Sequence, residues 1–357
     1  MINKKTTQVE KLFKTCALDA FVFFHLPNIR YLSGFSGTDG ALVVVGKETG
    51  FLTDSRYTTQ ARQQVVADNI REYRLKIDGV LEYLAEKGAV RVGFESDTLA
   101  YATVRELMEK GGAHEWVPVT REIRSLRCLK NESEIDALER AAALNADCFE
   151  EILGEIHPGA RERDIALALE FALKRRGAEE KAFDFIVASG IRGALPHGIA
   201  SEKTIASGEL VTIDFGCRLD GYHSDETVTL AVGEVSFRLR EIFDVVLEAH
   251  DRAIDKVSPG VALREIDAIA RQFINEQGFG DYFGHGTGHG LGLEVHEYPA
   301  VSTRSEEEAR EGMVFTIEPG IYIPDVGGVR IEDTVLVTAG GCRRLTRIPK
   351  GFRTLPV

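Results

Sequence analysis

An internal duplication is the feature that most restricts how this sequence can fold. Two segments of helical periodicity are joined through Pro158-Gly159, and the second of them ends at Gly177. The same arrangement recurs around Pro259-Gly260 and ends at Gly278. The two copies are 101 residues apart, and 18 residues separate the two glycines within each copy. Because this period is too long and the copies are too few for a solenoid, we predict two related α+β halves.

A pair of β-prone segments follows each pair of helical segments. In the first half they are residues 210–215 and 222–232, and in the second half they are residues 313–317 and 329–337. Runs of this composition, bounded by glycine and polar residues, are typical of strands. Two related halves that pack together leave a site near their pseudo-twofold axis. We therefore expect the chemistry of the chain to lie between these strands.

Two aspartates of the first half are predicted to share one face of a hairpin. Asp220-Gly221 between two strands is a strong signal for a two-residue turn. With that turn, Asp214 lies opposite Thr227 and Asp225 lies opposite Gly216, so both carboxylates point to the same side. Asp214 also interrupts an apolar strand, which predicts burial. Two buried carboxylates repel each other unless one is protonated or a cation lies between them.

The second half repeats this arrangement with glutamates. Glu318 follows the strand 313–317 and lies 104 residues after Asp214, while Glu332 lies in the returning strand, 107 residues after Asp225. Both offsets are close to that of the duplication. Four carboxylates that converge on one axis would be very costly to bury without cations, so the pattern predicts bound metal.

A glycine-rich segment between these strands supplies histidines. Residues 284–297 contain five glycines together with His285, His289 and His296. The spacing fits neither G-x-G-x-x-G nor H-E-x-x-H, so neither a phosphate loop nor that zinc motif is indicated. One histidine and four carboxylates would balance two divalent ions, about 3.5–4 Å apart, with room for a bridging hydroxide. Such oxygen-rich ligands favour Mn²⁺, Co²⁺ or Fe²⁺ over a thiolate-type zinc site.

Length and composition indicate a folded chain of two domains. The first third of the 357 residues alternates β-prone and helical segments, which is an α/β pattern. A polar, charged stretch near residues 121–131 is a plausible boundary, and Asn131 with Glu134 forms a capping box that begins the next helix. The charged run 305–311 is expected to form a solvated helix.

The net charge of −13 argues against general binding to nucleic acid or to anionic membranes.

Cysteine usage and the N-terminal sequence point to the cytoplasm. The five cysteines are scattered and form no C-x-x-C pair, which favours reduced thiols. No apolar segment of the export-signal type follows the N-terminal lysines, and the longest apolar runs are far shorter than a membrane span.

These motifs resemble those of the pita-bread metallopeptidase family, which includes Xaa-Pro dipeptidase (prolidase), aminopeptidase P, methionine aminopeptidase and creatinase. The resemblance covers roughly residues 125–345 and rests on the motifs IDFG, SDET, GHGTGH, IEPG and RIED. The first 120 or so residues, with TDSRY at 53–57, resemble the smaller N-terminal domain of prolidases and aminopeptidases P. We therefore expect an α+β protein. Residues 1–125 would form a creatinase/prolidase-like α/β domain, and residues 126–357 the duplicated pita-bread catalytic domain.

The resemblance implies a dinuclear metal site and a peptidase activity. Asp225 and Glu332 would bridge two divalent ions, Asp214 would bind one of them, and His289 and Glu318 would bind the other. The ions would be Mn or Co, with Zn or Fe as alternatives. A metal-bound hydroxide would attack the carbonyl of the bond before proline, and the metal ions would stabilise the oxyanion. The substrate would be a small peptide with proline at its second position, and the protein would be a homodimer.

The resemblance also implies roles for residues that bind no metal. His197 and His296 would hydrogen-bond the substrate carbonyl or the developing gem-diolate. His285 and Arg330 would line the pocket for the proline or its carboxylate, and Glu318 would carry the proton to the leaving nitrogen. Taken alone, His197 could be an exposed loop histidine and Arg330 a plain partner of Glu332.

One departure from the family pattern, and three alternatives, remain open at this point. Family members usually have an apolar residue and an arginine where this chain has Glu226 and Val228, although both positions should face away from the metals. The chain could be a non-catalytic peptide-binding relative, or a creatinase-like C–N hydrolase that works without metal. The intact set of five ligands counts against both. Dipeptidase and aminopeptidase activity are not distinguished.

Overall fold

The computed structural model describes residues 2–357, and side chains from Gln8 onward. The chain divides into two compact units, the first ending at Arg127 and the second comprising Cys128–Val357. The sequence places the boundary two residues earlier, between 125 and 126.

The first unit is an α/β domain around a mixed sheet. Its described strands follow the order β4-β3-β2-β1-β5-β6. Strands β1 to β3 pair antiparallel, whereas β5 pairs parallel with both β1 and β6. Apolar residues of the strands pack against Val80 and Tyr83 of α4. The elements are α1 (Ile2–Cys16), β1 (Ala20–Phe23), α2 (Leu26–Ser33), β2 (Ala41–Val45), β3 (Glu48–Thr53), α3 (Thr58–Gln64), β4 (Asn69–Glu72), α4 (Lys76–Glu86), β5 (Arg91–Glu95), α5 (Tyr101–Lys110), β6 (Glu115–Val119) and α6 (Arg121–Arg124).

The second unit contains the duplicated helix pairs that the sequence predicts. They are α7 (Glu132–Ile152) with α8 (Glu162–Arg175), and α9 (Phe237–Lys256) with α10 (Leu263–Glu276). The predicted capping box at Asn131 is present, with its side chain accepting from the Glu134 N–H. The four glycines that define the repeat all have positive φ, between 82° and 102°. Since only glycine adopts this conformation without strain, the same residue ends the same element in both copies.

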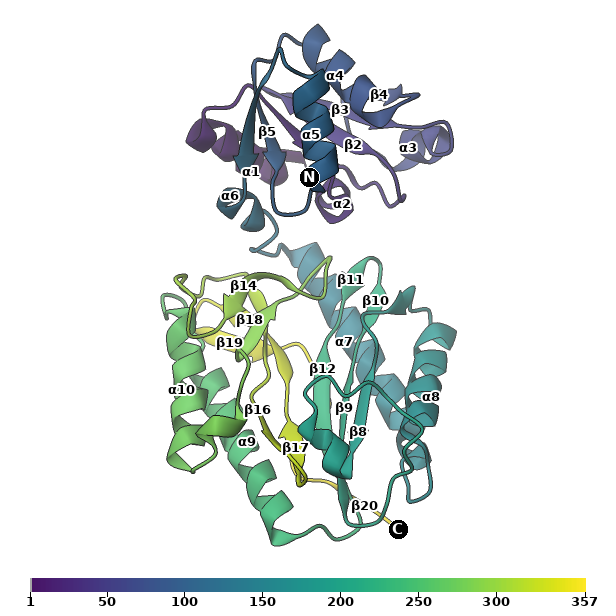
Figure 1. Ribbon diagram of the computed structural model, residues 1–357, viewed down its shortest axis with the longest axis vertical. Coiled ribbons are helices and arrows are strands. Elements are labelled where there is room, and N and C mark those ends of the chain that lie inside the picture. The colour runs from purple at the N-terminus through teal and green to yellow at the C-terminus, as the bar shows by residue number, and fades with distance from the viewer. Residues whose placement is uncertain (1) are drawn as a thin grey trace. The chain divides into compact units, whose positions relative to one another are not determined.

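Strands of both halves lie between the two helix pairs, with α7 and α8 on one side and α9 and α10 on the other (Figure 1). One four-stranded sheet has the order β20-β12-β9-β8, and one five-stranded sheet has the order β14-β13-β15-β18-β19. The bounds are β7 (Glu180–Lys181), β8 (Ile186–Ser189), β9 (Glu209–Phe215), β10 (Cys217–Leu219), β11 (Tyr222–His223), β12 (Glu226–Val232), β13 (Gly288–Gly290), β14 (Glu297–Val301), β15 (Val314–Ile317), β16 (Gly320–Ile323), β17 (Gly327–Arg330), β18 (Asp333–Thr338), β19 (Gly341–Arg344) and β20 (Thr354–Leu355), with short 3₁₀ helices at Leu153–Glu155, Gly190–Ala194 and Gly280–Tyr282.

The predicted hairpin register is confirmed where β9 pairs with β12. Asp214 lies opposite Thr227 in this antiparallel ladder. Asp220 and Gly221 have φ values of 51° and 82°, as a turn with two left-handed residues requires. The sheet therefore directs Asp214 to the face that the alternation of the strand predicts.

Two of the predicted strands are interrupted in the structure. The segment 222–232 is divided between β11 and β12, and the segment 329–337 is divided between β17 and β18. Each segment leaves one sheet and enters another at its break. Asp225 lies at the first break and Glu332 at the second. Both acidic residues thus occupy equivalent irregular positions, where the backbone belongs to no ladder.

The acidic run 305–311 is not the helix that the sequence predicts. Its backbone instead pairs with the start of α10, because the N–H of Leu263 donates to the Glu307 carbonyl and that of Ala309 donates to Val261. Ala309 is consequently buried. None of the helices in residues 2–357 is both long enough and apolar enough to cross a lipid bilayer.

A candidate metal centre between the two halves

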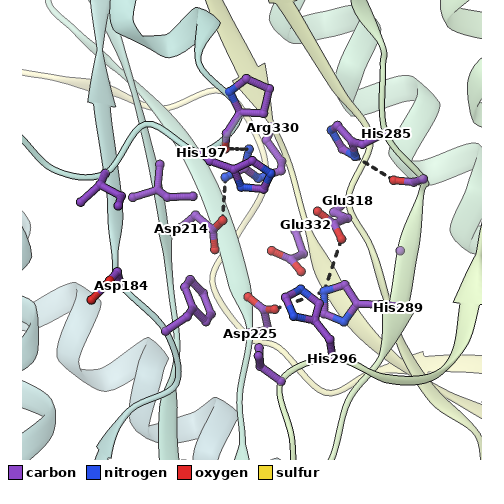
Figure 2. Close-up of a pocket in the computed structure, with 17 residues that line it drawn as sticks. Asp184, His197, Asp214, Asp225, His285, His289, His296, Glu318, Arg330 and Glu332 are labelled. Atoms are coloured by element: carbon purple, nitrogen blue, oxygen red, sulfur yellow. Dashed lines mark hydrogen bonds and ion pairs between the residues drawn. The ribbon is translucent and has the colours of Figure 1, made fainter. Parts of the chain in front are cut away.

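One cavity of about 410 Å³ collects all the residues that the sequence singles out (Figure 2). The carboxylates enter it from the ends of strands and from the breaks between strands in both halves. Apolar side chains form part of its wall. The predicted site residues that line it are His197, Asp214, Asp225, His285, His289, His296, Glu318, Arg330 and Glu332.

Three of these side chains lie close enough together to share one metal ion. Asp225, His289 and Glu332 each offer a ligand atom within 4.8 Å of the others. His289 Nε2 lies 3.5 Å from Asp225 Oδ2 and 3.4 Å from Glu318 Oε1. Its Nδ1 donates to the carbonyl of Gly290 at 3.1 Å. In the neutral ring this leaves the Nε2 lone pair directed at the carboxylates, as a metal ligand requires.

Two of the carboxylates, Asp214 and Glu332, are held by neighbouring hydrogen-bond donors. Asp214 Oδ2 accepts from Arg330 Nη2 at 2.6 Å, while its buried Oδ1 has no hydrogen-bond partner among the described residues. Glu332 Oε2 accepts from the Thr227 hydroxyl at 2.6 Å. Each carboxylate therefore keeps an oxygen that this side-chain network does not use.

Burial and mutual repulsion oppose ionisation of three of the acids in the cavity. Loss of hydration, followed by the neighbouring carboxylates, raises the pKa of Asp225 and of Glu332 well above the usual range. Burial likewise raises the pKa of Glu318 to about 7. Desolvation lowers the pKa of the His289 imidazole, so this ring is neutral and able to act as a ligand. Full ionisation of the cluster therefore requires added positive charge.

The chemistry of these donors fits divalent cations. The set is rich in oxygen and contains one neutral imidazole, and no cysteine is among the described residues that line the cavity. In the described part of the chain, Oδ1 of Asp214 has no hydrogen-bond partner, and the lone pair on Nε2 of His289 is unused. These two atoms are therefore free to bind a cation as ligands. Hard oxygen ligands with nitrogen suit Mn²⁺, Co²⁺ or Fe²⁺.

Backbone contacts between the halves fix the positions of the two acids at the strand breaks. The N–H of Glu332 donates to the Thr227 carbonyl at 3.2 Å, and the Thr334 hydroxyl donates to the Asp225 carbonyl at 3.0 Å. These bonds join β12 of one half to the start of β18 of the other.

The segment that carries His289 is held against β15. A Cβ on Gly288 would come within 1.8 Å of the Thr316 carbonyl oxygen, so the close approach requires glycine. Asp267 of α10 accepts from the Thr287 hydroxyl at 2.9 Å. Arg271 donates to the His285 carbonyl at 2.7 Å. The buried Asp267 and the partly buried Arg271 thus anchor the loop to its helix.

The other predicted residues surround this cluster. His197 is exposed, and the His296 ring lies 4.2 Å from the His289 ring, measured between centroids. Burial lowers the pKa of His296 to about 4, which keeps this ring neutral. Arg330 pairs with Asp214 and not with Glu332, and it also donates to the Pro196 carbonyl at 3.0 Å.

Sequence reasoning missed Tyr322. Its hydroxyl lies 2.9 Å from His285 Nε2 and 2.9 Å from Arg330 Nη1, so it connects the two side chains proposed to line the proline pocket. The sequence offered one signal for Tyr322 as a site residue, namely its position on β16, directly after the motif that contains Glu318. The apolar wall was also missed, and it consists of Phe183, Ile186, Ile199 and Val295.

Two residues that depart from the family pattern do not line the cavity. Glu226 Oε1 accepts from Lys350 Nζ and from the N–H of Ile348. Val228 packs in the apolar core with Phe149. The prediction that both side chains face away from the site is confirmed.

Comparisons with known proteins identify the family. Residues 136–339 match metallopeptidase family M24, and residues 5–129 match the creatinase/prolidase N-terminal domain. The chain belongs to metallopeptidase family M24. A Xaa-Pro dipeptidase of Pyrococcus horikoshii is 40% identical over 347 residues, which cover 97% of this chain and 98% of that protein.

Solved structures of such enzymes superpose on nearly the whole chain. A Xaa-Pro dipeptidase from Bacillus anthracis has a TM-score of 0.97 at 42% identity, covering 99% of this chain and 100% of its own. An X-Pro aminopeptidase from Thermotoga maritima has a TM-score of 0.90 at 35% identity, covering 98% and 99%. The predicted pita-bread fold with a creatinase-type N-terminal domain is confirmed. As a member of family M24, this protein is a metallopeptidase. The family implies divalent metal ions.

The contact between Gly288 and Thr316 yields the first prediction. Gly288→Ala should destabilise the chain by about 1–3 kcal/mol, because overpacking forces the two backbones apart, and it should weaken Mn²⁺ binding by moving His289. Gly284→Ala is the matched control, since no atom lies within 4 Å of its added Cβ. Thermal denaturation and Mn²⁺ titration of both variants provide the measurement. Equal melting temperatures and equal Mn²⁺ affinities in the two variants would contradict the prediction.

Proton release on metal binding yields the second prediction. The folded, metal-free chain should hold protons on its site carboxyls at pH 6, because Glu318 has a pKa near 7 and Asp225 and Glu332 are also raised. Mn²⁺ requires ionised carboxylates and should displace these protons. Because His289 is already neutral, it contributes none.

Calorimetry of Mn²⁺ binding in buffers of different ionisation enthalpy measures the number of protons released. That number should be larger at pH 6 than at pH 8, where Glu318 has already lost its proton. An equal release at both pH values would contradict the loss of the Glu318 proton between them, and no release at pH 6 would show that the carboxyls are ionised without metal.

Proposed function

We propose that this M24 peptidase hydrolyses the peptide bond before proline, using two divalent ions held by both halves of the duplicated domain. The observation that carries this proposal is the convergence of three buried carboxylates, the partly buried carboxylate of Glu318 and one neutral imidazole in one cavity. The proposed ligands are Asp214, Asp225, His289, Glu318 and Glu332. Asp225 and Glu332 would hold the ions between the two halves, since each lies where its own half passes from one sheet to another.

Divalent ions bound there would supply Lewis acidity toward water and toward the substrate carbonyl. The surrounding protein has to orient the peptide and move a proton. We assign the proton transfer to the leaving nitrogen to Glu318. Its Oε1 accepts from the Thr316 hydroxyl at 3.3 Å, and its backbone N–H donates to the Thr287 carbonyl at 2.7 Å, so its position is fixed from two sides.

His197 and His296 are proposed to stabilise the oxyanion. Both line the cavity, His197 from the loop after β8 and His296 beside the His289 ring. Imidazole N–H groups that are in place before the reaction stabilise a developing negative charge without further reorganisation.

Arg330, His285 and Tyr322 form the proposed proline subsite. Arg330 brings a buried positive charge, and its contact with the Pro196 carbonyl ties it to the loop of His197. The Tyr322 hydroxyl is in hydrogen-bond contact with both Arg330 and His285. The charge would attract the carboxylate of the peptide, while the apolar wall would contact its side chains.

A dipeptide with C-terminal proline is the proposed substrate. The similarity to the Bacillus anthracis dipeptidase, 42% identical with a TM-score of 0.97, supports this choice over the Thermotoga maritima aminopeptidase, at 35% and 0.90. The buried guanidinium of Arg330 gives a chemical reason to prefer a free carboxylate near the proline.

Metal removal tests the proposed reaction. Protein treated with a chelator should lose hydrolysis of Ala-Pro, and added Mn²⁺ or Co²⁺ should restore it. Asp225→Asn and Glu332→Gln should keep the fold and stay inactive with added metal. Their loss should exceed the roughly 10–100-fold typical of removing an outer-shell partner. Full activity of the chelated chain would instead support a creatinase-like mechanism, and absence of all hydrolysis in metal-loaded wild type would support a binding role.

Substrate length tests the dipeptidase assignment. Ala-Pro should be cleaved with a kcat/KM about tenfold or more above that of Ala-Pro-Pro, a difference of about 1.4 kcal/mol in transition-state stabilisation. Ala-Pro amide is the matched control, because it keeps the dipeptide length but lacks the carboxylate that Arg330 would attract. Equal rates for all three substrates would contradict the assignment and favour an aminopeptidase.

A further inference from the structure

A second cluster of buried charges lies behind the proposed metal centre. Glu226 and Asp333 each directly follow a proposed bridging ligand, and their side chains are 0% and 2% exposed. They are 107 residues apart, which is also the separation of Asp225 and Glu332. Since successive side chains along an extended chain point to opposite faces, the duplicated fold presents two acids toward the cavity and two acids away from it.

Lys350 contacts both of the acids that point away from the cavity, Glu226 and Asp333, which we call the rear acids. Its Nζ lies 2.6 Å from Glu226 Oε1 and 3.6 Å from Asp333 Oδ1, and its side chain is 3% exposed. Lys350 belongs to the chain after β19, outside both copies of the repeat. One ammonium group therefore contacts an equivalent acid from each half.

The segment that carries Lys350 makes further bonds to both acids. The N–H of Ile348 donates to Glu226 Oε1 at 3.0 Å. The Thr346 hydroxyl donates to Asp333 Oδ1 at 2.5 Å and accepts from the N–H of Thr334 at 3.2 Å. This segment is thus tied to the first residues of β12 and β18.

Two further basic side chains approach Asp333 from other elements. Arg344 Nε of β19 lies 3.2 Å from Asp333 Oδ2, and His250 Nε2 of α9 lies 3.3 Å from the same oxygen. Among the described residues, Glu226 Oε2 and Asp333 Oδ2 are both buried without a hydrogen-bond partner. Lys350 is the cation that the structure places on Glu226.

Any displacement of the rear acids would move the proposed ligands. Asp225 and Glu226 are consecutive, as are Glu332 and Asp333, so each pair shares a peptide unit. The bonds from Thr334 to the Asp225 carbonyl and from Glu332 to the Thr227 carbonyl connect the two strands at the same level. A buried carboxylate left without its cation would pull toward water or toward another donor.

We propose that Lys350 is a positioning residue, which sets the spacing of Asp225 and Glu332 by holding Glu226 and Asp333 together from behind. The inference rests on the proposed function, because it assumes that Asp225 and Glu332 bind metal. It assigns a role in metal binding to a residue that does not reach the cavity.

Metal titration of the full chain tests this role. Lys350→Met should weaken Co²⁺ binding to the metal-stripped protein by roughly 10–100-fold, the usual effect of losing an outer-shell partner. The visible absorption spectrum of bound Co²⁺ should change, because the ligand geometry changes. With Co²⁺ at saturation, kcat should fall while KM for Ala-Pro stays within about twofold.

Arg353→Met is the matched control. Arg353 lies in the same C-terminal segment and pairs with Glu150 at 3.0 Å, but its side chain is 44% exposed and contacts neither rear acid. This variant should keep the Co²⁺ affinity and spectrum of the wild type. The double variant Glu226→Gln with Lys350→Met removes one buried charge of each sign, so it should fold even if the single variant does not. It should still bind Co²⁺ weakly, since no ammonium reaches Asp333.

Two results would overturn the proposal. One is wild-type Co²⁺ affinity and spectrum in a folded Lys350→Met or double variant, and the other is an equal loss in Arg353→Met. If the wild-type chain itself bound no Co²⁺, the proposed function would fail first and the role of Lys350 with it. The wild-type titration therefore separates the two failures.

Discussion

Repulsion among buried carboxylates is the constraint on which the catalytic domain depends. The fold brings Asp214, Asp225, Glu318 and Glu332 into one cavity, and loss of hydration and mutual repulsion oppose the ionisation of the last three. Arg330 offsets part of this charge through Asp214. The rest calls for cations, which explains why a metallopeptidase of this family keeps a set of acids that would otherwise destabilise its core.

The duplication explains how so many acids reach one place. Each half contributes one acid near a strand end and one at a break between two sheets. When the halves pack together, the two pairs of acids meet in one cavity. The symmetry is incomplete, because His289 comes from the glycine-rich segment of the second half alone. The same geometry has a consequence behind the site, where Glu226 and Asp333 require compensation of their own.

Much of the fold could be predicted because it follows from local rules. The capping box at Asn131 and the turn at Asp220-Gly221 depend on residues close in sequence, and both are found. Two expectations were wrong for the opposite reason. The strand breaks at Asp225 and Glu332 arise where the chain changes sheets, and the run 305–311 pairs with the start of α10 instead of forming a helix. Both depend on distant segments.

The sequence by itself determined which acids face the site, because strand alternation, the hairpin turn and the repeat spacing indicate the direction of each one. Only the tertiary structure decided which groups pair. It joined Arg330 to Asp214, placed Tyr322 between His285 and Arg330, and set Lys350 against acids of both halves. Most of these contacts link residues far apart in the sequence, so they depend on how the halves pack, which no local pattern records.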